Sequence, residues 1–217
     1  MSKLRVHNLS MSLDGYAAGP DQSLEEPLGV GGERLHDWVF TTPYWLERIG
    51  KDASGAEATV DEEMLRAGDA NIGATIMGRN MFGPIRGEWP DESWTGWWGD
   101  EPPYHHPTFV LTHYPRPSVE MAGGTVFHFV TDGIEAALAR AFEAAGDQDV
   151  RLGGGAATVK EYLRAGLVDE MHIAIAPVLL GGGERLLDDM AGSGLEVVSF
   201  ATSPSVLHVH FGRPANG

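Results

Sequence analysis

Three consecutive glycines, Gly153 to Gly155, form the clearest pattern for ligand binding in the chain. They follow the short apolar stretch 150–152 and precede a segment with helical spacing. Backbone N–H groups without side chains at the start of a helix can bind a phosphate, although such a triplet can also serve only as a tight turn. The third glycine of the Rossmann G-x-G-x-x-G pattern would fall at Thr158, so the sequence favours a different cofactor-binding fold.

Two charged residues stand where strands are expected to end. Arg79 follows a strand and a glycine, at the sheet edge where open α/β folds bind ligands. It can pair with a phosphate or remain a surface arginine. Asp14 follows the first expected strand, where a carboxylate can contact a ligand, but Asp14-Gly15 is also an ordinary turn pair. Both residues are candidates for ligand binding.

Aromatic residues are concentrated in one segment, 89–106. The segment contains Trp89, Trp94, Trp97, Trp98 and Tyr104. This density favours packing over the core or a dimer contact, and stacking on a planar ligand such as a flavin is the alternative.

The histidines predict no metal site. His105 and His106 are adjacent, so on an extended chain they point opposite ways, and no third ligand is evident. His208 and His210 alternate with apolar residues, which predicts the polar face of the last strand and no chemistry. The chain has no cysteine, which excludes disulfides and thiolate chemistry, so redox chemistry would need a bound cofactor.

Composition predicts a folded, acidic protein. With 217 residues, 42% of them hydrophobic, and no evident linker, we expect one domain over residues 1–217. The net charge of −16 and the lack of a basic stripe argue against nucleic acid as a partner. The first seven residues carry no apolar signal, and no run approaches the ~20 apolar residues that span a bilayer, so we expect a cytoplasmic protein without membrane contact.

Strands and helices are expected to alternate along the chain. The periodicity predicts strands near 9–13, 71–77, 108–112, 125–130, 150–152 and 171–177. It predicts helical segments within 33–49, from 61 to 68, after Gly78, from a capping box at Asp132 and Glu135 to Gly146, and around 159–163. Segments 197–200 and 206–211 predict a closing antiparallel hairpin. This order indicates an α/β fold with a largely parallel sheet covered by helices on both faces.

Five segments together resemble a known family. They are Ser12-Leu13-Asp14-Gly15, Ile76 to Phe82, Val110-Leu111-Thr112, Leu152 to Gly155, and Ala176 to Gly181. In order and spacing they resemble the bacterial dihydrofolate reductase-like family, which includes the C-terminal reductase domain of bifunctional riboflavin biosynthesis proteins. The resemblance implies a three-layer fold with a mostly parallel central sheet and a C-terminal antiparallel hairpin.

The resemblance also implies a cofactor, NADPH, with FMN as the alternative. Arg79 would meet the adenosine phosphate, Thr112 would flank the adenine, and Gly153 to Gly155 would hold the pyrophosphate. The backbone at Leu9 and Ser10 and the loop near Ala17 would approach the nicotinamide. The implied cofactor contacts further include Gly78, Asn80, Leu152, Gly154, Ala156 and Thr158.

For the substrate, the resemblance implies an acidic residue on the helix before the Met-Gly-Arg strand. Counting back without gaps places Glu62 there, beside Asp61, and Asp14 would border the same cleft. We expect Asp14 or Glu62 to orient the substrate or to help deliver a proton. Two segments, 20–59 and 89–106, have no counterpart in a minimal dihydrofolate reductase and leave the substrate open.

The expected activity is hydride transfer from NADPH to a C=N or C=O carbon of a small planar heterocycle, such as a pterin or an aminopyrimidine. The alternative is a non-catalytic module that binds a nucleotide or a flavin on the same fold. Related proteins commonly form homodimers, and we expect one here, with the Trp-rich segment or the closing hairpin as the interface.

Overall fold

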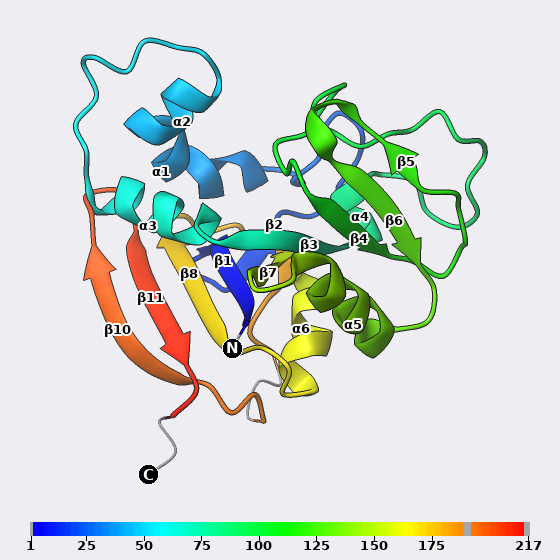
Figure 1. Cartoon of the computed structure of the whole chain (residues 1–217). Helices are drawn as coiled ribbons and strands as arrows, with labels where there is room; N and C mark the ends of the chain where they lie inside the picture. Colours follow the sequence, from blue (N-terminus) through cyan, green and yellow to red (C-terminus); the bar gives the residue numbers. More distant parts are fainter. Residues whose placement is uncertain (1, 189–191, 215–217) are drawn as a thin grey trace. The chain divides into compact units, whose positions relative to one another are not determined.

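The computed structural model describes residues 2–188 and 192–214 (Figure 1). The chain divides into two compact units. Within the described ranges, the first unit contains residues 2–6, 71–169 and 192–193, and the second contains residues 7–70, 170–188 and 194–214. Strand β1 (Leu4–Ser12) contributes its first residues to one unit and the remainder to the other. The expectation of one domain over residues 1–217 stays a prediction.

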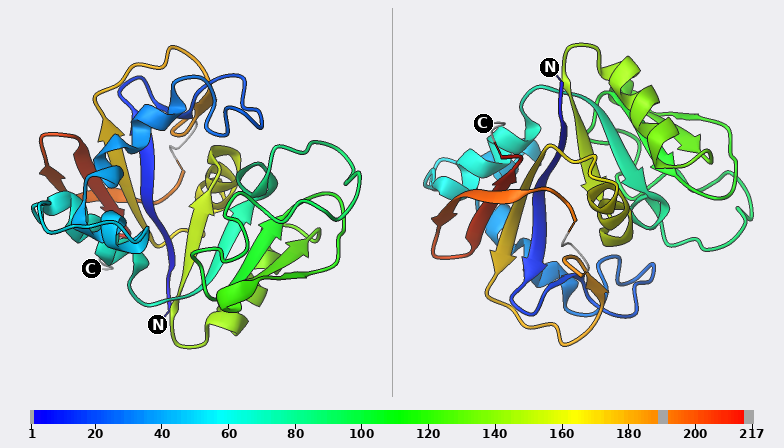
Figure 2. Two further views of the ribbon diagram at one scale, coloured as in Figure 1. Left: turned by 90° about the horizontal axis from the view of Figure 1, so that it is seen from above. Right: turned by 90° about the horizontal axis from the view of Figure 1, so that it is seen from below.

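The first unit is built on a parallel sheet. Its order is β7 (Asp149–Gly154), β3 (Ile72–Gly78), β4 (Pro107–Leu111), β6 (Val126–Val130) and β5 (Val119–Glu120). All neighbours are parallel except β5, which runs antiparallel to β6 (Figure 2, left). Strand β3 is buried at every residue except Ile72, as is typical of a central parallel strand covered on both faces.

Two helices of the first unit pack on this sheet. Helix α5 (Ile134–Ala145) contacts β3 and β4, and α6 (Ala156–Arg164) contacts β7 and β3. Helix α5 starts after Gly133 without any side-chain cap, so the predicted capping box is wrong. Asp132 pairs with Arg140 instead, at 2.6 Å. The unit also contains α4 (Arg79–Phe82) and the 3-10 helix η2 (Ala122–Gly124).

The second unit contains the antiparallel part of the fold. Strands β10 (Glu196–Thr202), β11 (Leu207–Gly212) and β8 (Glu170–Ala176) pair antiparallel in that order, with β1 next to β8. A separate small sheet pairs β2 (Tyr16–Ala18) with β9 (Glu184–Arg185). The helical elements are η1 (Gly32–His36), α1 (Asp37–Phe40), α2 (Pro43–Arg48) and α3 (Val60–Asp69).

Each unit has its own buried cluster. In the first unit the cluster lies around Met77, Phe82, Val110 and Phe127. The aromatic residues of the Trp-rich segment pack against it, namely Trp89, Trp94, Trp98 and Tyr104. In the second unit the buried cluster comprises Leu35, Trp38, Leu65, Ala174, Ala176, Val178 and Val206. Packing on the core is therefore one role of the Trp-rich segment.

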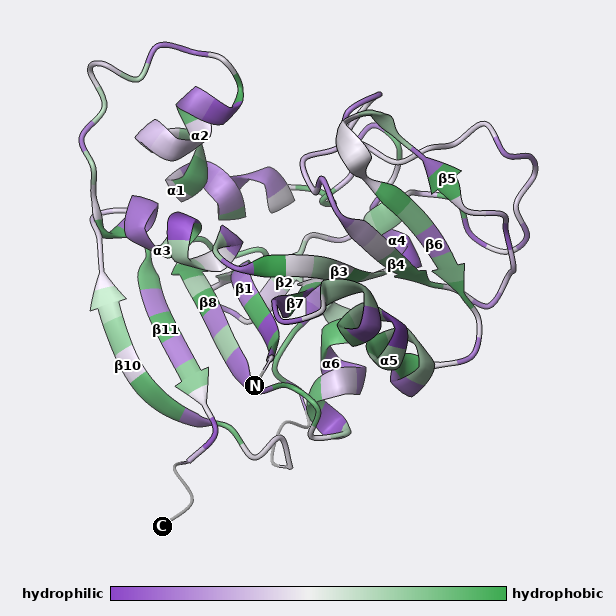
Figure 3. Cartoon of the chain, in the orientation of Figure 1, coloured by the Kyte–Doolittle hydropathy of each residue, from purple (hydrophilic) through white to green (hydrophobic). Residues whose placement is uncertain are grey.

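The predicted fold class is confirmed: the chain is mixed α/β, with a mostly parallel sheet and a C-terminal antiparallel hairpin. Strand β1 begins at Leu4 rather than near Leu9, and the short strands β2 and β9 were not predicted. Val197, Val198 and Phe200 are exposed on strand β10. Figure 3 shows this strand coloured mainly as hydrophobic. None of the helices in the described ranges is long and apolar enough to cross a membrane.

Candidate functional site

The predicted phosphate-binding residues of the first unit come together at one edge of its sheet. Gly78 at the end of β3 pairs with Leu111 at the end of β4, and Met77 pairs with Gly154 at the end of β7. The three parallel strands therefore end side by side. This edge is where open parallel sheets bind ligands, because loops from neighbouring strands diverge there.

The glycines at this edge allow close approach of the backbone. A Cβ atom on Gly78 would lie 2.2 Å from Thr158 Oγ1, so only glycine fits between β3 and α6. Gly153 and Gly154 complete β7 rather than forming the turn, and the Gly154–Gly155 peptide is cis. Gly155 immediately precedes α6, whose N-terminus has no side-chain cap. The first N–H groups of α6 are left to bind a phosphate or water.

Arg79 is not an ordinary surface arginine. Its guanidinium carbon lies 3.7 Å from the centre of the Trp89 ring and 5.1 Å from that of Tyr114. Its Nε and Nη2 atoms are buried and have no hydrogen-bond partner in the described residues. Burial lowers the pKa of Arg79, with Arg86 and Arg116 adding to the effect. A guanidinium held in this way is a donor set that an anion such as a phosphate would satisfy.

Two more arginines, Arg86 and Arg116, add to the positive potential around Arg79. Arg116 lies 5.0 Å from the Trp89 ring centre, so Trp89 contacts two guanidinium groups. Arg116 donates hydrogen bonds to the carbonyl oxygens of Trp94 and Glu92, which fixes the Trp-rich segment. In a chain of net charge −16, this group of arginines is a local concentration of positive charge, the kind of surface that attracts negatively charged ligands.

Other predicted cofactor residues of the first unit have defined local roles. The Thr112 N–H donates to Val130 O, and Thr112 Oγ1 contacts Tyr114 O at 3.4 Å. Asn80 is exposed on α4, next to Arg79. Leu152 is fully buried in β7, and Ala156 begins α6. Their backbone positions border the sheet edge that contains Gly78, Gly154 and Gly155.

The remaining predicted cofactor residues, Leu9, Ser10 and Ala17, belong to the second unit. Ser10 is buried, and its Oγ accepts a hydrogen bond from Trp38 Nε1 at 2.9 Å. Leu9 and Ala17 are half-buried. The Ser10 side chain is thus occupied by its hydrogen bond with Trp38.

Asp14 holds a loop in place. Its carboxylate accepts hydrogen bonds from the backbone N–H groups of Leu180, at 3.1 Å, and Gly181, at 2.7 Å. A hydrogen bond from Ser12 together with these amides lowers the pKa of Asp14 to about 2. Asp14 is therefore ionised at neutral pH and is suited to positioning the loop, rather than to donating a proton.

Two neighbouring carboxylates lie in the first turn of α3. Thr59 caps this helix by accepting from the Asp61 N–H. Asp61 and Glu62 are 5% and 7% exposed. Glu62 Oε1 pairs with Arg66 at 2.6 Å, whereas Glu62 Oε2 is buried without a partner in the described residues. The negative charge of both groups is favoured at a helix N-terminus.

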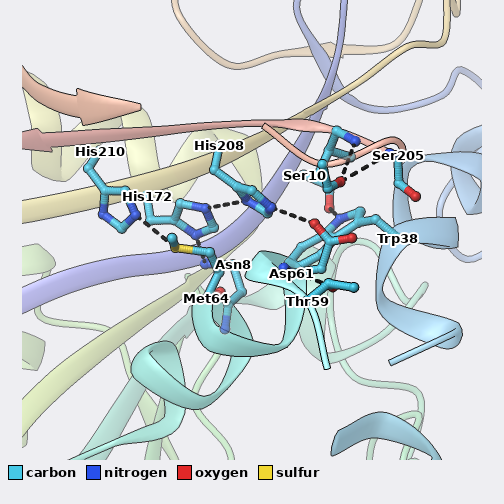
Figure 4. Close-up of polar contacts among 12 residues, drawn as sticks. Asn8, Ser10, Trp38, Thr59, Asp61, Met64, His172, Ser205, His208 and His210 are labelled. Atoms are coloured by element: carbon cyan, nitrogen blue, oxygen red, sulfur yellow. Dashed lines mark hydrogen bonds and ion pairs between the residues drawn. The ribbon is translucent and has the colours of Figure 1, made fainter. Parts of the chain in front are cut away.

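Asp61 is the end of a buried chain of hydrogen bonds (Figure 4). His208 Nε2 lies 2.7 Å from Asp61 Oδ1, and His172 Nε2 lies 3.0 Å from His208 Nδ1. The backbone N–H of Asn8 donates to His172 Nδ1 at 3.2 Å. Trp38 packs edge-on against the His208 ring, with the ring centres 5.3 Å apart.

The prediction that His208 and His210 form a polar outer face of the last strand is wrong for His208, which is fully buried. Helix α3 and Trp38 cover this face, because Asp61 contacts His208 and Met64 contacts His210. His210 pairs across the sheet with His172. The sequence shows histidines in the segments that become β8 and β11. It does not show the register of these two strands, which brings the histidines together.

No group of three or more potential ligands within residues 2–188 and 192–214 is arranged to hold a metal ion. His106 instead lies 2.8 Å from Thr75 Oγ1, and His105 contacts the carbonyl of Gly123.

The parallel sheet, its glycine edge and the closing hairpin together define a fold of the dihydrofolate reductase type. The chain belongs to the family described as the RibD C-terminal domain, whose model matches residues 6–209. No protein with a curated description gave a significant match.

Solved structures with the same fold include three relatives. A putative riboflavin biosynthesis protein from Shewanella sp. PV-4 has a TM-score of 0.61 and 22% identity, covering 99% of this chain and 100% of that one. Dihydrofolate reductase from Enterococcus faecalis, complexed with NADP(H) and RAB-propyl, has a TM-score of 0.54 and 15% identity, covering 98% and 97%. A Thermotoga maritima diaminohydroxyphosphoribosylaminopyrimidine deaminase/5-amino-6-(5-phosphoribosylamino)uracil reductase has a TM-score of 0.54 and 12% identity, covering 98% and 57%. At these identities the likeness shows the fold alone.

Proposed function

We propose that this protein is an NADPH-dependent reductase that transfers a hydride to a C=N or C=O carbon of a small planar heterocycle. Family membership supports the reductase class. The Enterococcus faecalis neighbour was solved with NADP(H), which supports a nicotinamide cofactor. The Thermotoga maritima neighbour is named as a uracil reductase, which supports an aminopyrimidine-type acceptor. A pterin is the second acceptor class to test.

The observation that carries this proposal is the sheet edge around Arg79. The two unpartnered nitrogens of Arg79 and the cationic surroundings suit a phosphate group. At the same edge a Cβ on Gly155 would meet no atom within 4 Å, and α6 begins there without a side-chain cap. These residues fit the phosphates of a dinucleotide.

Bound NADPH would supply the hydride, and the protein would supply alignment and a proton. Arg79 would pair with the adenosine phosphate, and the N–H groups at the start of α6 would bind the pyrophosphate. The backbone at Leu9 and Ser10 would face the nicotinamide. Asp14 would keep the loop at Leu180 and Gly181 in position, and a carboxylate of α3 would handle the proton.

The test is acceptor-dependent oxidation of NADPH by the purified protein. Dihydrofolate and 5-amino-6-(5-phosphoribosylamino)uracil are the two acceptors, and NADH is the comparison cofactor. We expect NADPH consumption with at least one acceptor and slower consumption of NADH. Binding of NADPH without turnover of either acceptor would support the non-catalytic module, and a yellow protein that retains FMN would support a flavin. A protein that binds neither nicotinamide contradicts the proposal.

A further inference from the structure

Arg116 follows strand β4 and is almost fully buried, with 9% of its surface exposed. Its Nη1 donates to Trp94 O at 2.7 Å, and its Nη2 donates to Glu92 O at 2.6 Å. Burial lowers the pKa of Arg116, while Glu92 and Asp91 oppose the shift. Burial of a charged group is unfavourable, so the two hydrogen bonds to the Trp-rich segment are what keep Arg116 in this position.

The loop that contains Arg116 is tied to the Trp-rich segment at a second point. Trp89 Nε1 donates to Tyr114 O at 3.0 Å, and the Tyr114 N–H donates to Thr112 Oγ1 at 3.2 Å. The loop after β4 therefore contacts the segment through Tyr114 at position 89 and through Arg116 at positions 92–94. Two separate attachments fix the segment more firmly than either could alone, because each restricts the backbone between them.

The Trp-rich segment is also fixed against the end of α4, the helix that begins with Arg79. Trp94 Nε1 donates to Phe82 O at 3.0 Å. A Cβ on Gly83 would lie 2.2 Å from the same nitrogen, so the glycine at 83 is what allows this close approach. Helix α4, the Trp-rich segment and the loop after β4 therefore form one connected assembly within the first unit.

Two guanidinium groups of this assembly approach the same indole ring. The guanidinium carbons of Arg79 and Arg116 lie 3.7 Å and 5.0 Å from the centre of the Trp89 ring. Arg79 Nε, Arg79 Nη2 and Arg116 Nε are buried donors without a hydrogen-bond partner among the described residues. Within residues 2–188 and 192–214, no carboxylate lies within 4.0 Å of either guanidinium. Their mutual repulsion is therefore uncompensated at short range.

Neighbouring cations with unused donors favour an anion of high charge with several acceptor atoms. A phosphate monoester carries a charge of about −1.5 to −2 at neutral pH and has three free oxygens. A phosphate that bridges two groups, as in a pyrophosphate, has less charge and fewer free oxygens. The surroundings of Trp89 therefore match a monoester better than a bridging phosphate.

We propose that Arg116 is a positioning residue for a phosphate monoester. It holds Trp89, and through the Trp89 ring it holds the guanidinium of Arg79, in the arrangement that binds the phosphate. This inference rests on the proposed function, in which the monoester is the phosphate on the 2′-oxygen of the NADPH adenosine. Arg116 thereby determines the preference for NADPH over NADH. The face of Trp89 that contacts Arg79 is closed to a planar ligand such as a flavin.

The test compares ligands that differ only in the monoester, by calorimetric titration of the intact protein. The two pairs are NADPH with NADH, and 2′-AMP with adenosine. We expect the wild-type protein to prefer the phosphorylated member of each pair, and Arg116→Gln to reduce that preference by about 10-fold. Binding of NADH should change by less than about 2-fold, because NADH does not use this phosphate site. A variant that is merely damaged in its fold would lose both cofactors alike.

Two further variants serve as controls. Arg140→Gln removes a cation of the same unit that pairs with Asp132 instead, so it should keep the wild-type preference. Arg116→Lys keeps the charge but not the planar group that reaches two carbonyl oxygens, so it should lose about 3-fold of the preference. Arg116→Lys decides the matter if Arg116→Gln does not fold, and an unchanged preference in it would overturn the proposal.

Failure of this inference and failure of the proposed function give different results. A wild-type preference for NADPH that persists in both Arg116 variants, or an equal loss of NADPH and NADH binding, overturns the role of Arg116 and leaves the reductase intact. A protein that binds NADPH and 2′-AMP through Arg116 but reduces neither acceptor supports the role of Arg116 and contradicts the reductase. A wild-type protein that binds neither NADPH nor 2′-AMP contradicts both.

Discussion

The guanidinium group of Arg79 rests on the ring of Trp89, 3.7 Å from its centre, and Trp89 Nε1 donates to Tyr114 O. Arg79 lies in one of the five segments on which the resemblance to the dihydrofolate reductase-like family rests, whereas Trp89 belongs to the segment 89–106, which is not one of them. The contact therefore makes segment 89–106 part of the proposed phosphate site.

Removing the Trp89 ring should weaken NADPH binding. A stacked guanidinium is worth about 0.5–2 kcal/mol, so Trp89→Leu should raise the Kd for NADPH by ~2- to 30-fold. The Kd for NADH should change less, since NADH lacks the phosphate on the 2′-oxygen of its adenosine. Calorimetric titration measures both values. Trp97, which contacts Trp94 but not Arg79, provides the control variant Trp97→Leu. Equal effects of the two substitutions would remove Trp89 from the site.

A side chain at position 78 should collide with Thr158. Because a Cβ there would lie 2.2 Å from Thr158 Oγ1, Gly78→Ala should destabilise the fold by about 1–3 kcal/mol and weaken NADPH binding. Thr158→Ala removes the colliding oxygen, so the double variant should regain much of the stability. Urea unfolding of the four proteins gives the coupling energy. Additive losses would show that β3 and α6 do not meet in this way.

Stability should fall as the pH decreases below neutrality. Burial lowers the pKa of His172 from 6.5 to about 2, so below pH 6.5 the unfolded chain binds a proton that the folded chain does not. The loss of stability begins near pH 6.5 and is complete only near pH 2. From pH 6.5 to pH 5, His172 alone should account for up to ~2 kcal/mol of the free energy of unfolding.

Replacing His172 should make the free energy of unfolding depend less on pH. His172→Gln lowers the stability at pH 7 but removes one proton-binding group, so its unfolding free energy should decline less between pH 6.5 and pH 5. His113 is exposed, and His113→Gln should retain the wild-type slope. Chemical denaturation across this pH range supplies the comparison. Identical slopes for wild type and His172→Gln would show that His172 does not remain neutral in the folded state.

The edge strand β10 is the surface that we propose for a homodimer. Val197, Val198 and Phe200 are 58%, 68% and 72% exposed on it, which is unusual for an isolated edge strand. Phe200→Asp should shift the protein from dimer to monomer in analytical ultracentrifugation. Val30, exposed in a loop of the same unit, provides the control Val30→Asp. A wild-type monomer, or a Phe200→Asp dimer, would contradict this interface.

Local patterns made the fold class and the strand ends at Gly78 and Gly154 predictable. Both patterns consist of residues that are adjacent in sequence. One is a buried strand followed by Gly78 and Arg79, and the other is a buried strand followed by Gly153 to Gly155. The structure places both at neighbouring strand ends. The predicted capping box does not form because the N-cap residue of α5 is Gly133, which has a φ of 91°. Asp132 therefore lies outside the helix.

The histidine chain could not be predicted in the same way. His208 and His210 alternate with apolar residues, the usual pattern for a strand with one solvated face. The burial of His208 depends on Trp38 and Asp61, which are far away in sequence. The partner His172 is identified only by the register of β11 against β8. Counting residues in the sequence selected Glu62, and its neighbour Asp61 is the carboxylate that is hydrogen-bonded to His208.

The most direct test of the central claim is calorimetric titration of the cofactor-free protein and of Arg79→Ala with NADPH and NADH. An arginine that binds the adenosine phosphate should favour NADPH over NADH by about 10-fold or more in the wild-type protein. Arg79→Ala should lose most of that preference while binding NADH almost as before. Absence of binding to either cofactor, or an equal loss for both in Arg79→Ala, would contradict the account.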